Sequence, residues 1–162
     1  MKRSLFAAFF LLFATCIPVT LITLEVPTIY AQDSRIALVQ NYTLIPHEQV
    51  DEAHVRELAT VMALNGYVPH PVVVDLNTHI ILDGHHRVQA LKKLGLTLVP
   101  VYFVDYLNDN TITVTAWREG EVVTKETVIQ AGLTGKLLPI KSSKNSIPHK
   151  PTNIYIPLDV LR

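Results

Sequence analysis

The stretch Val72–Gly95 constrains the fold of this chain more than any other. It begins with two runs of apolar, mostly β-branched residues, Val72–Val74 and Ile80–Leu82, which flank a polar turn at Asn77–Thr78. Such runs around a polar turn predict a β-hairpin. Apolar residues then recur at helical spacing, and a glycine stands where a left-handed C-terminal cap is favoured. A helix is therefore expected directly after the second strand.

The junction between this strand and this helix reads Asp83-Gly84-His85-His86-Arg87. A glycine lets the backbone approach a ligand closely, and the first helical turn offers unpaired N–H groups to an anion. Arginine can fork two phosphate oxygens, and imidazoles add donors or acid–base groups. The junction is therefore predicted to bind phosphate. Alternatively, Asp83 caps the helix and the other side chains are solvated, but capping leaves the histidines and the arginine unexplained.

With its strand–loop–helix setting, this motif resembles the ParB/sulfiredoxin-like superfamily, and within it the free serine kinases, whose signature is the same Asp-Gly-His-His-Arg. The resemblance extends over roughly residues 36–144, including Val99-Pro100-Val101 as a further strand. It implies an α/β (α+β) fold with a small mixed sheet and flanking helices. Sulfiredoxin chemistry is excluded because it needs a cysteine in this loop, and the single cysteine is Cys16.

The resemblance also implies functional residues outside the motif. Free serine kinases use a glutamate in a similar Pro-His-Glu stretch as catalytic base, and Glu48 stands at the matching place. The alternative is that Glu48 only favours the N-terminal end of the next helix dipole. Trp117 matches a tryptophan that helps enclose the serine substrate, and packing in the core is its equal alternative.

A basic segment, Lys136–Asn145, carries three lysines and no acidic residue. Free serine kinases have a similar Pro-x-Lys-x-Thr-Arg-His there, which contacts phosphate and substrate. This chain keeps Lys141 and a hydroxyl at Ser143, but has Lys144 for the arginine and Asn145 for the histidine. Lysine is a point charge where arginine forks, and asparagine cannot exchange protons. The departure bears on serine specificity, and a solvated basic loop is the alternative.

The function implied is a nucleotide-dependent phosphotransferase that acts on a small hydroxyl substrate, by resemblance free L-serine to O-phosphoserine, with ATP or ADP and Mg²⁺. Glu48 and His86 would be catalytic, and Trp117 and Asn145 would bind substrate. The residues expected to bind nucleotide or phosphate are Asp83, Gly84, His85, His86, Arg87, Lys141, Ser143 and Lys144, with Asp83 also a candidate Mg²⁺ ligand. The alternative is a non-catalytic nucleotide- or phosphate-binding ParB-like module, and a nuclease ranks third.

Charge and composition narrow the partners. The chain has 14 basic and 14 acidic residues and a formal net charge of zero. It therefore lacks the basic face that non-specific nucleic-acid binding needs, and no nucleic-acid partner is expected. With 162 residues, 49% of them hydrophobic, the chain is expected to form one domain with its own core.

The first 31 residues are expected to lie outside that domain. Lys2 and Arg3 precede an uncharged, mostly apolar run, residues 4–24, as in a secretory signal peptide or an uncleaved membrane anchor. Cleavage is expected after Ala31, which would make the domain extracytoplasmic. The alternative is a misassigned start codon on a cytoplasmic protein. Residues 32–145 would then be the nucleotide-binding domain, and residues 146–162 a tail that adds an edge strand or stays mobile.

Local signals predict further elements. Asp51 can cap a helix that ends at Gly66, and Thr124 can cap a short helix over Lys125–Ala131. The nearly continuous apolar run Leu98–Val104 is typical of a central strand covered on both faces. Strands are also expected within Ser34–Leu44 and over Thr111–Trp117.

Overall fold

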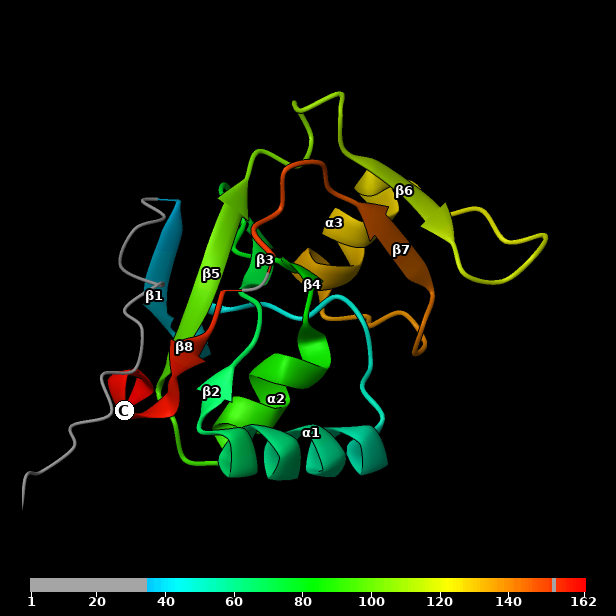
Figure 1. Ribbon diagram of the computed structural model, residues 1–162. Coiled ribbons are helices and arrows are strands. Elements are labelled where there is room, and N and C mark those ends of the chain that lie inside the picture. Colours follow the sequence, from blue (N-terminus) through cyan, green and yellow to red (C-terminus); the bar gives the residue numbers. More distant parts are fainter. Residues whose placement is uncertain (1–34, 153) are drawn as a thin grey trace, which may run out of the picture.

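A four-stranded mixed sheet forms the centre of the computed structural model, which describes residues 35–152 and 154–162 (Figure 1). Its order is β1-β5-β3-β4. Strand β1 (Ile36–Gln40) runs antiparallel to β5 (Leu98–Val104), β5 runs parallel to β3 (Val72–Asp75), and β3 runs antiparallel to β4 (Ile81–Asp83). The predicted α/β class, with a small mixed sheet and β5 inside it, is confirmed.

The expected hairpin is the pair β3–β4, and a buried carboxylate holds its turn. Asp75 is only 1% exposed. Its Oδ2 accepts hydrogen bonds from the N–H of Thr78 at 2.9 Å and from the Thr78 hydroxyl at 2.7 Å. Its Oδ1 accepts from the N–H of Tyr106 at 3.0 Å, which joins the hairpin to the chain beyond β5. Because a buried carboxylate needs such partners, Asp75 fixes the turn in one conformation.

Helices α1 (Glu52–Asn65) and α2 (His85–Lys93) lie side by side against one face of the sheet (Figure 1). The predicted cap of α1 is confirmed, because the Asp51 side chain accepts hydrogen bonds from two N–H groups of the first turn. Gly66 ends α1 in the left-handed region, at φ 76°. The residues that these helices bury against the sheet are Val55, Ala59, Met62, Val88 and Leu91.

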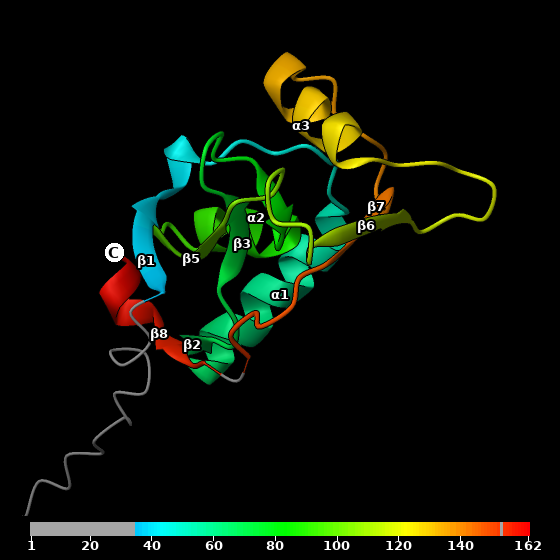
Figure 2. The same ribbon diagram turned by 90° about the horizontal axis from the view of Figure 1, so that it is seen from above.

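Helix α3 (Lys125–Thr134) covers the opposite face, as Figure 2 shows from above. Successive residues of a strand point to opposite faces, and Val72 and Val74 belong to the core on the α1–α2 side while Val73 belongs to the core on the α3 side. This double burial explains the unbroken apolar run of β3. Thr124 caps α3 as predicted, through a bond from the N–H of Thr127.

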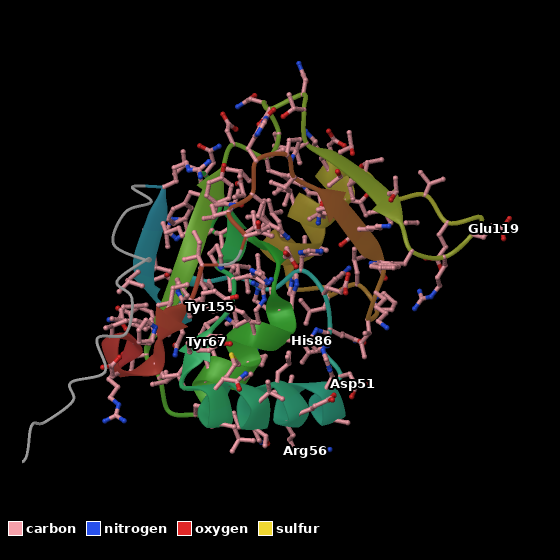
Figure 3. All side chains as sticks on the ribbon, in the orientation of Figure 1. Asp51, Arg56, Tyr67, His86, Glu119 and Tyr155 are labelled. Atoms are coloured by element: carbon pink, nitrogen blue, oxygen red, sulfur yellow. The ribbon has the colours of Figure 1, made fainter. Side chains whose placement is uncertain are left out.

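A two-stranded ribbon, β6 (Thr113–Ala116) with β7 (Ser143–Ser146), projects beside this sheet. The strands run antiparallel, and the loop after β6 reaches away from the rest of the molecule, with Glu119 near its tip (Figure 3). The ribbon brings residues 141–145 back towards the start of α2. Two segments of the sequence that resemble the serine kinases therefore meet here.

The described residues of the expected tail, 146–152 and 154–162, pack against the rest of the domain. The short strand β8 (Ile156–Pro157) is the edge strand that the sequence allowed, and it pairs antiparallel with β2 (Tyr67–Val68). The 3-10 helix η3 (Leu158–Leu161) follows it. Ile154, Ile156 and Leu161 are buried in the same core as α1. The rings of Tyr67 and Tyr155 meet edge to face at 4.8 Å on this side of the molecule (Figure 3).

The proposed signal peptide or anchor, residues 1–31, lies outside the described residues. Within the described ranges, no helix has both the length and the apolar character to cross a bilayer.

Helix α3 contacts Ile80, the residue just before β4. A Cβ atom on Gly132 would lie 2.6 Å from Cδ1 and 2.7 Å from Cγ1 of Ile80, which is fully buried. Gly132→Ala is therefore expected to lower the free energy of unfolding by about 1–2 kcal/mol, although alanine favours helix. Chemical denaturation measures this. In a double-mutant cycle, Ile80→Val should recover part of the loss, and strictly additive effects would contradict the clash.

Candidate functional site

A cavity of about 220 Å³ lies where the N-terminus of α2 meets the segment before α1 and the loop before β7. Its walls include most of the residues that the sequence singled out. The lining residues are Glu48, His54, Leu82, Asp83, His85, His86, Trp117, Lys141 and Ser143. A neighbouring cavity of about 480 Å³ shares His54, His86 and Lys141 with it. The larger one is within the size range of small-molecule sites.

The segment Ile45–Gln49 crosses the site as an extended strand-like bridge. Ile45 pairs with Ile80 beside β4, and Glu48 pairs with Leu138 on the way to β7. The N–H of Gln49 donates to the Leu138 carbonyl, and the N–H of Leu138 donates to the His47 carbonyl, both at 2.9 Å. These backbone bonds fix the position of Glu48 between the two parts of the site.

The Glu48 carboxylate is held by the backbone of the loop before β7. Its Oε1 accepts from the N–H of Lys141 at 2.7 Å, and its Oε2 accepts from the N–H groups of Ser142 and Ser143 at 3.1 Å each. Lys141 has a positive φ of 55°, which turns these N–H groups towards one point. A carboxylate has about four acceptor positions, and the Ser143 hydroxyl lies close to the fourth, 3.2 Å from Oε2.

A buried histidine, His47, supports this arrangement, although no sequence signal assigned it a role. Its Nδ1 hydrogen-bonds the carbonyl of Ile81, and its Nε2 lies 2.8 Å from the Ser143 hydroxyl. A carbonyl only accepts, so Nδ1 carries the proton and Nε2 accepts from Ser143. Burial lowers the pKa of His47, against the opposing effects of the Ile81 carbonyl and the Glu48 charge. The imidazole is therefore neutral at neutral pH.

The two motif histidines are also fixed by backbone donors. His85 Nε2 accepts from the N–H of His47 at 3.3 Å, and His86 Nε2 accepts from the N–H of Asp51 at 3.0 Å. His86 and Asp51 lie together at the start of α2 and α1 in Figure 3. Since Nε2 accepts in each ring, Nδ1 must carry the proton of the neutral imidazole. Each ring can therefore donate one N–H to an anion.

Both rings favour the neutral form. Burial lowers the pKa of His85 to about 3, with a further contribution from His47. Burial and the neighbouring His54, whose ring is 5.0 Å away edge to face, also lower the pKa of His86. The two imidazoles therefore act as uncharged donors, and the positive charge near the cavity comes from Lys141 and Lys144.

Arg87 and Asp83 form a structural cluster beside the loop that the sequence predicts to bind phosphate. Arg87 Nη1 donates to the carbonyls of His70 and Pro71 at 2.9 and 2.6 Å, and Nη2 lies 3.2 Å from Asp83 Oδ2. The same carboxylate oxygen accepts from Lys150 Nζ at 2.8 Å. Two backbone carbonyls and the Asp83 carboxylate therefore surround the guanidinium. The guanidinium also packs against Gly84, whose φ is 105°.

Two alternatives for Asp83 fail on this geometry. The N-cap of α2 is Gly84, with no side-chain capping bond, so Asp83 is not the cap. Burial raises the pKa of Asp83, but the charges of Arg87 and Lys150 outweigh it and lower the pKa. Asp83 Oδ2 already pairs with the side chains of Arg87 and Lys150, so Asp83 does not fit as a Mg²⁺ ligand. Within residues 35–152 and 154–162, no group of three acidic, histidine or cysteine side chains is placed to hold a metal ion.

We expect Arg87→Ala to lower the free energy of unfolding by about 2–3 kcal/mol, because the side chain is only 15% exposed and two carbonyls lose a charged donor. The matched control is Lys150→Ala, which removes a more exposed partner of the same carboxylate and should cost less than about 1 kcal/mol. Urea denaturation compares them. Equal stability of Arg87→Ala and the unmodified chain would show that these contacts contribute little.

The ribbon residues divide between the cavity and the scaffold. Trp117 is 54% exposed, so packing in the core is excluded as its role, and Lys144 Nζ lies 5.1 Å from its ring centre. Asn145, expected to bind substrate, instead uses both ends of its amide within the fold. Its Oδ1 accepts from the Tyr106 hydroxyl, and its Nδ2 donates to the Leu82 carbonyl at 2.9 Å. Asn145 therefore ties β7 to β4.

The sequence is similar to those of serine kinases and of a ParB-like protein. The sequence is 32% identical over 71 residues to an ATP-dependent L-serine kinase of Staphylothermus marinus, covering 41% of this chain and 28% of that protein. It is 38% identical over 74 residues to a ParB-like protein of Sulfolobus acidocaldarius, covering 46% and 36%. The chain thus spans only about a third of the length of these relatives.

The fold resembles solved structures over a longer range. A free serine kinase in complex with AMP superposes with a TM-score of 0.70 at 15% identity, covering 79% of this chain and 94% of that one. A variant of a free serine kinase in complex with ADP gives a TM-score of 0.66 at 14% identity, covering 79% and 94%. At this identity the likeness concerns the fold.

The family model described as the ParB N-terminal domain matches residues 25–119, more than half of the sequence, and the chain therefore belongs to the ParB N-terminal domain family, as its motif predicted.

Proposed function

We propose that this protein is a nucleotide-dependent phosphotransferase that acts on a small hydroxyl substrate, with free L-serine as the substrate that its similarity to serine kinases favours. One observation carries the proposal. The Glu48 carboxylate is positioned by three backbone N–H groups on the wall of the cavity that also contains the N-terminus of α2. A base and an anion-binding helix end thus share one small cavity, as transfer of a phosphoryl group to a hydroxyl requires.

The phosphate groups would bind at the start of α2. The first N–H groups of a helix have no partner within it, and the helix dipole adds positive potential at this end. The Nδ1–H groups of His85 and His86 extend the set of donors. Lys141, which lines the cavity, and Lys144, whose Nζ lies over the Trp117 ring, would supply positive charge. Gly84 allows the close approach, and Arg87 holds the loop in shape through the carbonyls of residues 70 and 71.

The acceptor hydroxyl would bind against Glu48. Phosphoryl transfer depends on alignment and charge neutralisation more than on covalent chemistry, so the chief task of the protein is to hold the two substrates in line. The Glu48 carboxylate would take the hydroxyl proton as the oxygen attacks the terminal phosphorus. Trp117, exposed beside the cavity, would cover the substrate and exclude water.

The test is direct. The full chain is incubated with free L-serine, Mg²⁺ and ATP, ADP or CTP in turn, and O-phosphoserine is measured by ³¹P NMR together with the nucleotide product. Formation of O-phosphoserine with an equal amount of the nucleotide product is the expected result. The similar kinases named ATP-dependent make ATP the first donor to test.

The second candidate function is a nucleotide- or phosphate-binding module without turnover. Its support is the loss of the histidine at position 145, since Asn145 cannot exchange protons and its amide is engaged within the fold. Calorimetry separates the two. Saturable binding of ATP or ADP without O-phosphoserine from any donor would favour the module.

A further inference from the structure

We propose that Ser143 is itself a phosphoacceptor, so that the protein phosphorylates its own chain at this hydroxyl. The inference rests on the proposed function, because the phosphoryl group would come from a nucleoside triphosphate bound at the start of α2. Its basis is the position of the Ser143 hydroxyl, 2.8 Å from His47 Nε2 and 3.2 Å from Glu48 Oε2.

The three residues Ser143, His47 and Ile81 form the arrangement that activates a serine. A nucleophile is recognised by a base within hydrogen-bonding distance and by a third group that orients the base. Here the Ile81 carbonyl holds the proton of His47 on Nδ1, and the lone pair of Nε2 therefore faces the Ser143 hydroxyl. The imidazole is completely buried, so it has no alternative contact with solvent.

Location singles Ser143 out from the serines beside it. Ser143 lines the same 220 Å³ cavity as Asp83, His85 and His86, where the phosphates would bind. Ser142 is only 4% exposed, and its hydroxyl donates to the Pro139 carbonyl at 2.8 Å. Ser146 stands at the far end of β7, paired with Thr113 at the opposite end of the ribbon from Ser143.

The step balances with the groups present. Ser143 Oγ forms a bond to the terminal phosphorus of the nucleoside triphosphate, and the bond from that phosphorus to the bridging oxygen breaks. The nucleoside diphosphate leaves with the electron pair, and the hydroxyl proton passes to His47 Nε2. Burial disfavours the imidazolium that forms, and the Ile81 carbonyl and the Glu48 charge beside Ser143 offset part of that cost. The product is phosphoserine at position 143.

The experiment uses the full chain with ATP and Mg²⁺ and follows intact mass, with peptide mapping of the modified residue. The expected result is a mass increase of one phosphoryl group at Ser143. Ser143→Ala should reduce the modification to background, whereas Ser146→Ala, on the same strand, should leave it unchanged. Ser143→Thr retains a hydroxyl at this position and should restore modification. Phosphate on any residue other than 143 would overturn the inference.

Two controls exclude other routes. The fraction modified per unit time should not change when the protein is diluted, because donor and acceptor belong to one chain, and a rate proportional to protein concentration would overturn modification within the chain. Heat-unfolded protein added to the folded preparation should remain unmodified, whereas a contaminating kinase in that preparation would label it.

Free L-serine in a parallel reaction separates this inference from the proposed function. O-phosphoserine without modified protein overturns the role of Ser143 and leaves the proposed function standing. Modified Ser143 without O-phosphoserine supports the inference and overturns free serine as the substrate. Neither product with any nucleotide overturns both.

Discussion

Glu48→Gln is expected to lower the rate of phosphoryl transfer by about 10²–10⁴-fold while the affinity for nucleotide changes little. A general base acts on the acceptor proton in the transition state, so its removal affects turnover more than ground-state binding. Glutamine has the same shape, but its amide nitrogen cannot accept a proton. Steady-state kinetics measures turnover, and calorimetry measures binding.

The position of Glu48 makes a structural control essential. Its carboxylate also holds the loop before β7 through three N–H groups, and glutamine can accept at only one end. Thermal unfolding and nucleotide affinity of the variant show whether the loop survives. The matched control is Glu52→Gln, the same chemical change on an exposed residue at the start of α1. Full activity of Glu48→Gln would remove Glu48 as the base.

The elements that could be predicted from the sequence are those fixed by local signals. The start and end of α1 follow from Asp51 and Gly66, because a capping side chain and a left-handed glycine act within a few residues. The β3–β4 hairpin followed from the two apolar runs around a polar turn. The alternative that Asp83 caps the next helix is wrong, since Asp83 ends β4 and Gly84 is the N-cap of α2, without a side-chain capping bond.

The partners of the site residues could not be predicted, because they come from distant parts of the sequence. Lys150, 67 residues from Asp83, lies in the segment that the sequence indicates is a C-terminal tail, yet it binds the motif carboxylate. The motif predicts that Arg87 forks phosphate, but the carbonyls of residues 70 and 71 and Asp83 surround its guanidinium. Periodicity and composition carry no information on such pairs. Only the resemblance to serine kinases pointed to Glu48, and nothing pointed to His47.

A second large effect is expected from pH, since the fold buries neutral histidines. The pKa of His85 falls to about 3 in the folded protein through burial, whereas an unfolded histidine titrates near 6.5. Above about pH 6.5 both states are neutral at this residue. Below it, the unfolded chain binds a proton that the folded chain does not. The free energy of unfolding should therefore decrease by about 1.4 kcal/mol per pH unit for this residue as pH falls towards 4.

The variant His85→Gln tests this directly. Glutamine does not titrate, and its side-chain oxygen can still accept the hydrogen bond from the N–H of His47 that His85 Nε2 accepts at 3.3 Å. Urea denaturation at a series of pH values from about 7 to about 4 should give a slope that is shallower than that of the unmodified chain by about one proton. The remaining slope belongs to His47, His70 and His86, whose pKa values burial also lowers. Near pH 4 it also includes the carboxylates whose pKa values are lowered in the fold, which are Asp51, Asp83, Asp109 and Glu126. His149→Gln, which changes an exposed histidine, is the matched control and should keep the steep slope.

An unchanged slope in His85→Gln would mean that His85 gains its proton in the folded state as readily as in the unfolded chain. Its imidazole would then bind phosphate as a cation rather than as a neutral N–H donor.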